Sequence, residues 1–179
     1  SDPAIKIEYR GRLAIVTINN EKKLNALNGN QYYALAQALR EVATHDEVYI
    51  TLLIGKGRYF LRMLSQPFIH LAKPQPCVLA PTNTSYSGAD VSLSQPSPEE
   101  QRIRSENPHR FWLQSFVANN LNITHAFYTH PKILVVGLNG PVIGLSAALV
   151  AFADFIYATP QTFLLTPFSS LGLVTEGGA

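Results

Sequence analysis

A glutamate near the end of the chain is the residue best suited to move a proton. Glu176 lies between Thr175 and two glycines, in a stretch that is otherwise apolar. A carboxylate in apolar surroundings loses part of its hydration, and its pKa then rises towards the range in which a general base works. The alternative interpretation is an ordinary glutamate in a surface loop. The pattern makes Glu176 the candidate base.

Two further pieces could stabilise the negative charge that such a base creates. The stretch Asn139–Ala148 has the pattern of a strand end, a glycine-bearing turn and a helix start. The first N–H groups of a helix have no intrahelical partner, and the helix dipole makes that end positive, so an oxyanion there needs no charged side chain. The turn Ser87–Asp90 could supply a second N–H from another loop. Each piece alone is also explained by a glycine turn that packs a helix on a sheet.

Together with Asn25–Leu27 upstream, these pieces resemble the crotonase (enoyl-CoA hydratase/isomerase) superfamily, and most of all the fungal peroxisomal Δ3,Δ2-enoyl-CoA isomerases. The likeness runs from about Ile5 to the end of the chain, except for residues 61–86, and it is most specific in Asn139–Val150 and Pro167–Gly178. It implies that residues 1–179 form one partial core domain of an α/β fold, a crotonase-like spiral of ββα units. The C-terminal helical region of that fold is expected to be missing.

The resemblance also implies the roles of individual residues. The backbone N–H groups of Ala89 and Leu145 would form the oxyanion hole, and Glu176 would be the catalytic base. Glu176 would take a proton from C2 of a 3-enoyl-CoA and return it at C4, which gives 2-trans-enoyl-CoA in fatty acid β-oxidation. No cofactor and no metal are expected, because CoA is part of the substrate. The residues implied in acyl-CoA binding are Ser87, Gly88, Ala89, Asp90, Val91 and Leu145.

Two departures from the superfamily pattern favour isomerisation. Hydratases of the superfamily use two glutamates to activate water, and the matching positions here are Ala148 and Phe168. Water addition therefore lacks its acid and base, whereas one carboxylate is enough to shuttle a proton. Other crotonase reactions remain alternatives, either hydration or dienoyl-CoA isomerisation, although the latter would need a further acidic residue with no clear candidate. A truncated chain without catalytic activity is the alternative of a different class.

Residues 61–86 differ from their surroundings. In the superfamily a strand ending like Gly57–Phe60 continues directly into a turn like Ser87–Asp90, but here 61–86 stand between them. This segment contains four prolines and shows neither helical nor strand periodicity. Our hypothesis is that 61–86 is an atypical insertion translated from a retained intron, rather than an evolved loop.

Composition limits the partners and the compartment. The 179 residues carry a net charge of +2 without a basic cluster, so nucleic acid is a poor candidate partner. No apolar run approaches the length of a membrane span, and the single Cys77 allows no internal disulfide. The resemblance implies an acyl-CoA thioester as substrate, a homo-oligomer (trimer or hexamer) and a location in the peroxisome.

Hydrophobic periodicity predicts alternating strands and helices around these pieces. The predicted strands are Ile5–Tyr9, Leu13–Ile18, Val48–Ile54, Ile133–Leu138, Phe155–Ala158 and Thr162–Leu165. The predicted helices are Gln31–Thr44, a long helical region over Pro98–Tyr128, and Gly144–Ala153.

Overall fold

A β-hairpin at the start of the chain begins a five-stranded sheet. The computed structural model describes residues 4–63, 102, 105–109, 118–166, 168, 175 and 177. Only the hairpin pair is antiparallel, and every later strand joins in parallel. In spatial order the strands are β1 (Ile5–Arg10), β2 (Leu13–Ile18), β4 (Ile50–Gly55), β6 (Ile133–Leu138) and β8 (Phe155–Ala158).

A second, smaller sheet takes up the chain after each strand from β2 onwards. Its four parallel strands are β3 (Ala26–Leu27), β5 (Leu61–Met63), β7 (Val142–Ile143) and β9 (Leu164–Leu165). The chain thus passes from the large sheet to the small one and back, and each turn lies beside the turn before it. This arrangement confirms the predicted α/β spiral.

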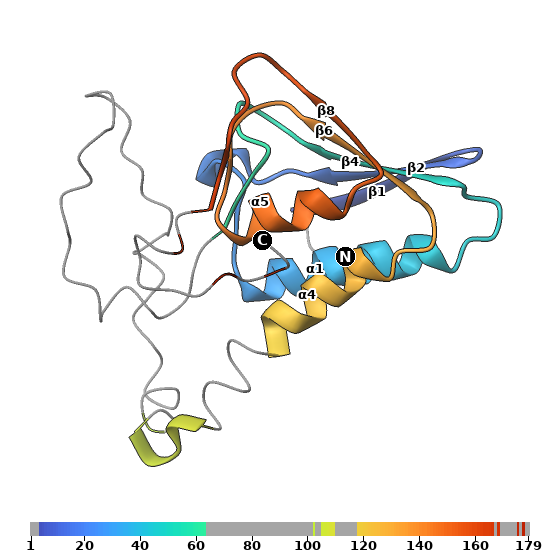
Figure 1. Ribbon diagram of the computed structural model, residues 1–179. Coiled ribbons are helices and arrows are strands. Elements are labelled where there is room, and N and C mark those ends of the chain that lie inside the picture. The colour runs from blue at the N-terminus through green and yellow to red at the C-terminus, as the bar shows by residue number, and fades with distance from the viewer. Residues whose placement is uncertain are drawn as a thin grey trace.

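The helices form two layers on one side of the large sheet (Figure 1). Helix α1 (Gly29–Ala43) begins with a capping box in which the Asn28 side chain accepts from the Gln31 N–H and the Gln31 side chain accepts from the Asn28 N–H. Helix α4 (Ala118–Tyr128) packs on α1. Helix α5 (Leu145–Leu149), extended by the 3₁₀ turn η5 (Val150–Phe152), lies between the sheet and the α1–α4 pair. Another 3₁₀ turn, η1 (Glu21–Lys23), precedes β3.

The predicted elements are found, with shifted ends such as the start of β4 at Ile50 instead of Val48 and of β9 at Leu164 instead of Thr162, and with three larger differences. The helix predicted over Gly144–Ala153 is α5 followed by η5 and is therefore shorter and tighter. The region Pro98–Tyr128 is not one continuous helix, because Asn107 is not helical. Asn107 precedes Pro108, whose ring disfavours the helical conformation of the residue before it. Third, the first residues of the aperiodic segment, Leu61–Met63, form β5 between β3 and β7.

Strand β5 bears on the insertion hypothesis for residues 61–86, because deleting the segment would also remove this strand from the small sheet. Deleting 61–86 joins Phe60 to Ser87 and is expected to raise both the melting temperature and the isomerase rate, since a shorter connection would hold Ala89 more firmly. Ser87–Ala89 would then have to replace Leu61–Met63 in the small sheet, where Leu61 is fully buried. Thermal unfolding and product analysis of the joined protein measure both effects.

A companion deletion of 64–86 is the control for that experiment, because it keeps β5. If both deletions lower the melting temperature and the rate, the segment is a structural element of this protein and the insertion hypothesis is wrong. Residues 64–86 themselves lie outside the described part of the chain.

Candidate active site

The turn between β7 and α5 presents a helix start with no capping side chain. Gly144 is the N-cap, with φ of 80° and ψ of −144°, a backbone conformation that residues other than glycine rarely adopt. Its N–H donates to the Leu165 carbonyl at 2.8 Å, and its carbonyl accepts from the Ala147 N–H at 2.9 Å. The backbone of Gly144 is thus fixed on both sides. The N–H of Leu145, which follows it, is the first of α5.

Gly177 brings the end of the chain against this helix start. A Cβ built on Gly177 would lie 2.6 Å from Leu145 Cδ1, 3.3 Å from Ala148 Cβ and 3.7 Å from Thr124 Oγ1. Only a residue without a side chain approaches α5 so closely, and the φ of 63° at Gly177 independently favours glycine. The residue that follows Glu176 in the chain therefore packs on the residue predicted to supply an oxyanion donor.

The structure describes only one of the residues predicted for the site. Leu145 is 1% exposed at the start of α5. Thr175, which precedes Glu176 in the chain, is exposed, and Gly177, which follows it, is half-buried. Its raised pKa stays a prediction. The other predicted residues, which are Glu176 and the run Ser87, Gly88, Ala89, Asp90 and Val91, lie outside the described part of the chain.

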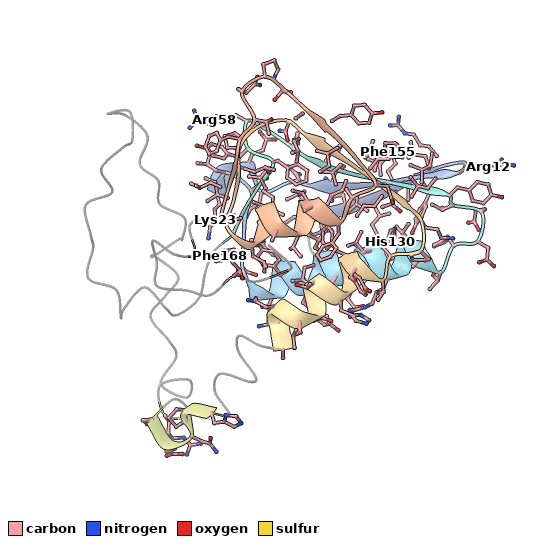
Figure 2. The ribbon with its side chains drawn as sticks, viewed as in Figure 1. Arg12, Lys23, Arg58, His130, Phe155 and Phe168 are labelled. Carbon is pink, nitrogen blue, oxygen red and sulfur yellow. The ribbon has the colours of Figure 1, made fainter. Side chains whose placement is uncertain are left out.

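The two positions that carry glutamates in hydratases are apolar and buried. Ala148 is 3% exposed on α5, and Phe168 is 6% exposed. Figure 2 shows Phe168 at the same end of the molecule as the start of α5, with His130 at the opposite end. Neither position can therefore activate water.

Asn25 fixes the loop that leads into β5. It is fully buried and adopts a left-handed backbone conformation, with φ of 56°. Its side-chain amide donates to the carbonyls of Lys56 at 2.7 Å, Tyr59 at 2.8 Å and Phe60 at 3.2 Å. Its side-chain oxygen accepts from the Asn20 N–H at 2.8 Å. The Asn25 side chain thus holds the loop before β5 in place, which gives the stretch Asn25–Leu27 a structural role.

The turn before β7 packs on the same loop. The Asn139 amide donates to the Gly57 carbonyl, and the Phe60 N–H donates to the Pro141 carbonyl at 3.4 Å. A Cβ on Gly140 would lie 1.9 Å from the Arg58 carbonyl oxygen. The loop before β5 and the turn before β7 therefore hold each other, through the Asn139 side chain and through backbone atoms.

Tyr32 is a site residue that the sequence pattern did not reveal. Its hydroxyl lies 3.0 Å from Ser146 Oγ, within hydrogen-bonding distance, although the two residues are 114 positions apart. Burial raises the pKa of Tyr32 well above its ordinary value, so the hydroxyl stays neutral at physiological pH. The sequence predicts a helix over Gln31–Thr44, which contains Tyr32, but no sequence signal indicates a bond to so distant a residue.

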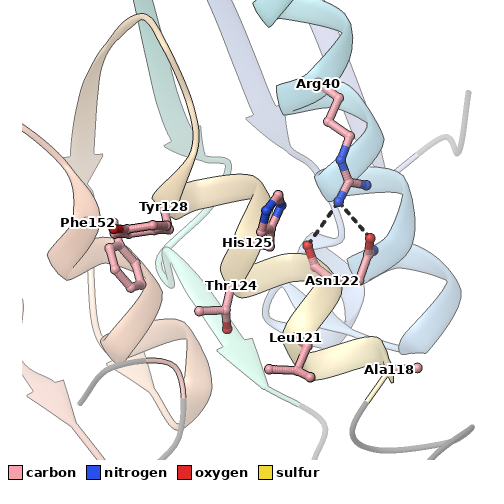
Figure 3. Close-up of a pocket in the computed structure, with 8 residues that line it drawn as sticks. All are labelled: Arg40, Ala118, Leu121, Asn122, Thr124, His125, Tyr128 and Phe152. Carbon is pink, nitrogen blue, oxygen red and sulfur yellow. Dashed lines mark hydrogen bonds between the residues drawn. The ribbon is translucent and has the colours of Figure 1, made fainter.

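A surface groove of about 740 Å³ runs along α4 towards η5 (Figure 3). At one side Arg40 donates to the carbonyl of Asn122 and, at 2.7 Å, to its side-chain oxygen. At the other the rings of Tyr128 and Phe152 meet edge to face, with centroids 6.1 Å apart. None of the described residues that line the groove carries a carboxylate. Its lining residues are Arg40, Ala118, Leu121, Asn122, Thr124, His125, Tyr128 and Phe152.

The described residues include neither a candidate metal centre nor a candidate membrane-spanning helix. No group of three or more His, Cys, Asp and Glu side chains there is arranged to hold a metal ion. No helix in the same residues is long and apolar enough to cross a membrane.

The chain is similar in sequence to fungal isomerases of acyl-CoA thioesters. Over 176 residues the chain is 59% identical to the Delta(3,5)-Delta(2,4)-dienoyl-CoA isomerase of Pyricularia oryzae and 37% identical to the 3,2-trans-enoyl-CoA isomerase of Saccharomyces cerevisiae. Each match covers 97% of the chain and 54% of the relative. The Delta(3,5)-Delta(2,4)-dienoyl-CoA isomerase of Saccharomyces cerevisiae is 30% identical over 169 residues, covering 94% of the chain and 53% of the relative. No protein-family model matches the chain.

Among solved structures, an enoyl-CoA hydratase/isomerase from Mycobacterium paratuberculosis superposes with a TM-score of 0.69 over 98% of the chain and 57% of its own length, at 20% identity. The chain has the crotonase fold. Its sequence is homologous to a fungal dienoyl-CoA isomerase and a fungal 3,2-trans-enoyl-CoA isomerase, as the resemblance implied. This crotonase-fold chain spans about half the length of the curated relatives it matches.

Proposed function

We propose that this crotonase-fold chain carries the catalytic core of an isomerase that converts 3-enoyl-CoA to 2-trans-enoyl-CoA. The observation that supports this most directly is the contact of Gly177 with Leu145 and Ala148. It brings the position next to Glu176 to the start of α5, as a base and an oxyanion donor acting on one substrate require.

In the proposed reaction the N–H groups of Leu145 and Ala89 donate hydrogen bonds to the thioester carbonyl oxygen. Glu176 removes a proton from C2, and the electrons move into a dienolate whose negative charge rests on that oxygen. The same carboxyl group returns the proton at C4, which leaves the double bond between C2 and C3. No cofactor takes part, because the proton is only moved within the substrate.

Isomerisation of 3,5-dienoyl-CoA to 2,4-dienoyl-CoA is the second candidate. The 59% identity to the Pyricularia dienoyl-CoA isomerase favours it. Within Saccharomyces cerevisiae, however, the chain is 37% identical to the 3,2-trans-enoyl-CoA isomerase and 30% identical to the dienoyl-CoA isomerase. The dienoyl reaction returns the proton at C6, farther from C2. We therefore expect it to need a second acidic residue, and Ala148 and Phe168 supply none.

One assay separates the two candidates. The chain is tested as it stands and as a chimera in which it replaces the matching 176 residues of the Pyricularia relative. Each protein is incubated with a 3-enoyl-CoA and a 3,5-dienoyl-CoA, and the acyl-CoA products are separated by chromatography. Faster conversion of 3-enoyl-CoA supports the proposed reaction, whereas faster conversion of 3,5-dienoyl-CoA favours the second candidate. A chimera that binds acyl-CoA without converting either substrate supports a non-catalytic chain.

Hydration is expected to be slow in the same proteins. Because Ala148 and Phe168 replace both hydratase carboxylates, addition of water to 2-trans-enoyl-CoA should be at least about 100-fold slower than isomerisation of 3-enoyl-CoA. Formation of 3-hydroxyacyl-CoA measures the hydration rate. Equal rates of hydration and isomerisation would mean that the motifs are misplaced.

The remaining parts of the proposal are supported only by the family resemblance and by a relative from Mus musculus whose name includes the word peroxisomal. We place the reaction in fatty acid β-oxidation in the peroxisome, and we propose that the protein acts as a trimer or hexamer. Fluorescence microscopy of a tagged protein and light scattering test these two statements.

A further inference from the structure

The first turns of α1 and α5 are joined by the hydrogen bond between Tyr32 and Ser146. Both residues are buried, with exposures of 6% and 0%, and their oxygens are 3.0 Å apart. A buried hydroxyl that loses its partner keeps the cost of its lost hydration, so this pair resists separation.

Tyr32 is itself rigidly placed. It lies in the first turn of α1, where its N–H donates to the Asn28 carbonyl at 2.9 Å and the capping box closes the helix. One turn further on, Leu35 and Ala36 are fully buried in the core. The Tyr32 hydroxyl is therefore attached to a fixed backbone, and its position depends on the position of α1.

Ser146 directly follows Leu145. The Leu145 N–H belongs to the Gly144–Leu145 peptide, and a bond that fixes the Ser146 side chain holds the backbone one residue after that peptide. On the other side, Gly177 packs on the Leu145 side chain. The turn is thus held from two directions, by a hydrogen bond from α1 and by contact with the end of the chain.

We propose that Tyr32 is a positioning residue that aims the Leu145 N–H by holding Ser146. The inference rests on the proposed function, in which this N–H stabilises the enolate. An oxyanion donor works only where its distance and direction are right in the transition state, and loss of a well-placed donor lowers turnover more than substrate binding.

The test is a double-mutant cycle of Tyr32→Phe, Ser146→Ala and the double variant. Each single change is expected to lower kcat about tenfold with little change in KM, since the donor is displaced rather than removed. The double variant should be no slower than the slower single variant, because both changes remove the same bond. Independent, multiplicative effects would overturn the proposal.

Two controls distinguish positioning from general loss of stability. Tyr33→Phe alters an exposed neighbour on α1 and should leave kcat unchanged. Val42→Ala creates a cavity at the far end of α1 and lowers the melting temperature without touching Ser146. If Val42→Ala lowers kcat as much as Tyr32→Phe does, at a temperature where both are folded, the role of Tyr32 is only structural.

Amide hydrogen exchange tests the positioning role of Tyr32 independently of catalytic activity. Amides of Leu145–Leu149 should exchange faster in Tyr32→Phe and Ser146→Ala than in the parent, but not in Val42→Ala. Unchanged exchange in Tyr32→Phe overturns the positioning role even if the parent is an active isomerase. Absence of isomerase activity in the parent overturns the proposed function, and the exchange result then decides separately whether Tyr32 orders the turn.

Discussion

Glu176→Gln is expected to lower the isomerase rate by about 10²- to 10⁴-fold, the usual contribution of a general base. The amide has nearly the shape of the carboxylate but cannot take a proton from C2. Acyl-CoA binding should change little, because the proposed contacts to the thioester come from backbone N–H groups. Single-turnover kinetics gives the rate, and isothermal titration with a saturated acyl-CoA gives the affinity.

A matched control shows whether the loss is specific. Glu8→Gln makes the same chemical change at an exposed position on β1, where Glu8 pairs with Arg10, and should keep the parental rate. Near-normal turnover in Glu176→Gln would show that another residue abstracts the proton.

Gly140→Ala is expected to cause the largest loss of stability among single substitutions in the site region. The new Cβ would lie 1.9 Å from the Arg58 carbonyl oxygen and 2.8 Å from the Arg58 carbonyl carbon. Both are backbone atoms, so the loop before β5 or the turn before β7 must move. We expect a loss of about 3 kcal/mol or more, which lowers the melting temperature of a chain of this size by roughly 6–12 °C.

Gly29→Ala is the control for this substitution. Its Cβ would meet only Asn119 Nδ2, at an ordinary 3.6 Å, and Gly29 lies in the first turn of α1. The free energy of unfolding should therefore stay within about 1 kcal/mol of the parent. If the two alanine variants melt at the same temperature, the close approach of Gly140 to Arg58 does not hold in solution.

Much of the fold could be predicted from the sequence, because strand and helix periodicity is local. Ile133–Leu138 and Phe155–Ala158 were predicted with the bounds that β6 and β8 have. The two-residue strands β3 and β7 are too short to show any period. Strand β5 forms because its backbone pairs with β3 and β7 on either side, which no pattern within residues 61–63 indicates.

Only those parts of the candidate site that belong to recognisable sequence motifs could be predicted. Leu145 stands at a helix start, as the glycine turn before it indicates. The bond between Tyr32 and Ser146 and the contact of Gly177 with Leu145 depend on how separate turns of the spiral meet, so composition and spacing could not reveal them. Glu176 and Ala89 lie outside the described residues, and their roles stay predictions.

The strand order has a consequence for synthesis on the ribosome. In the large sheet, β1, β2, β4, β6 and β8 lie side by side in the order in which they are translated. When a new strand of the large sheet emerges, the strand with which it pairs has already been synthesised. No strand of this sheet has to insert between two that have already paired. Such a chain can fold progressively as it emerges, one turn of the spiral at a time. Its sheet grows at one edge, so at every stage the open edges of the large sheet are β1 and the newest strand.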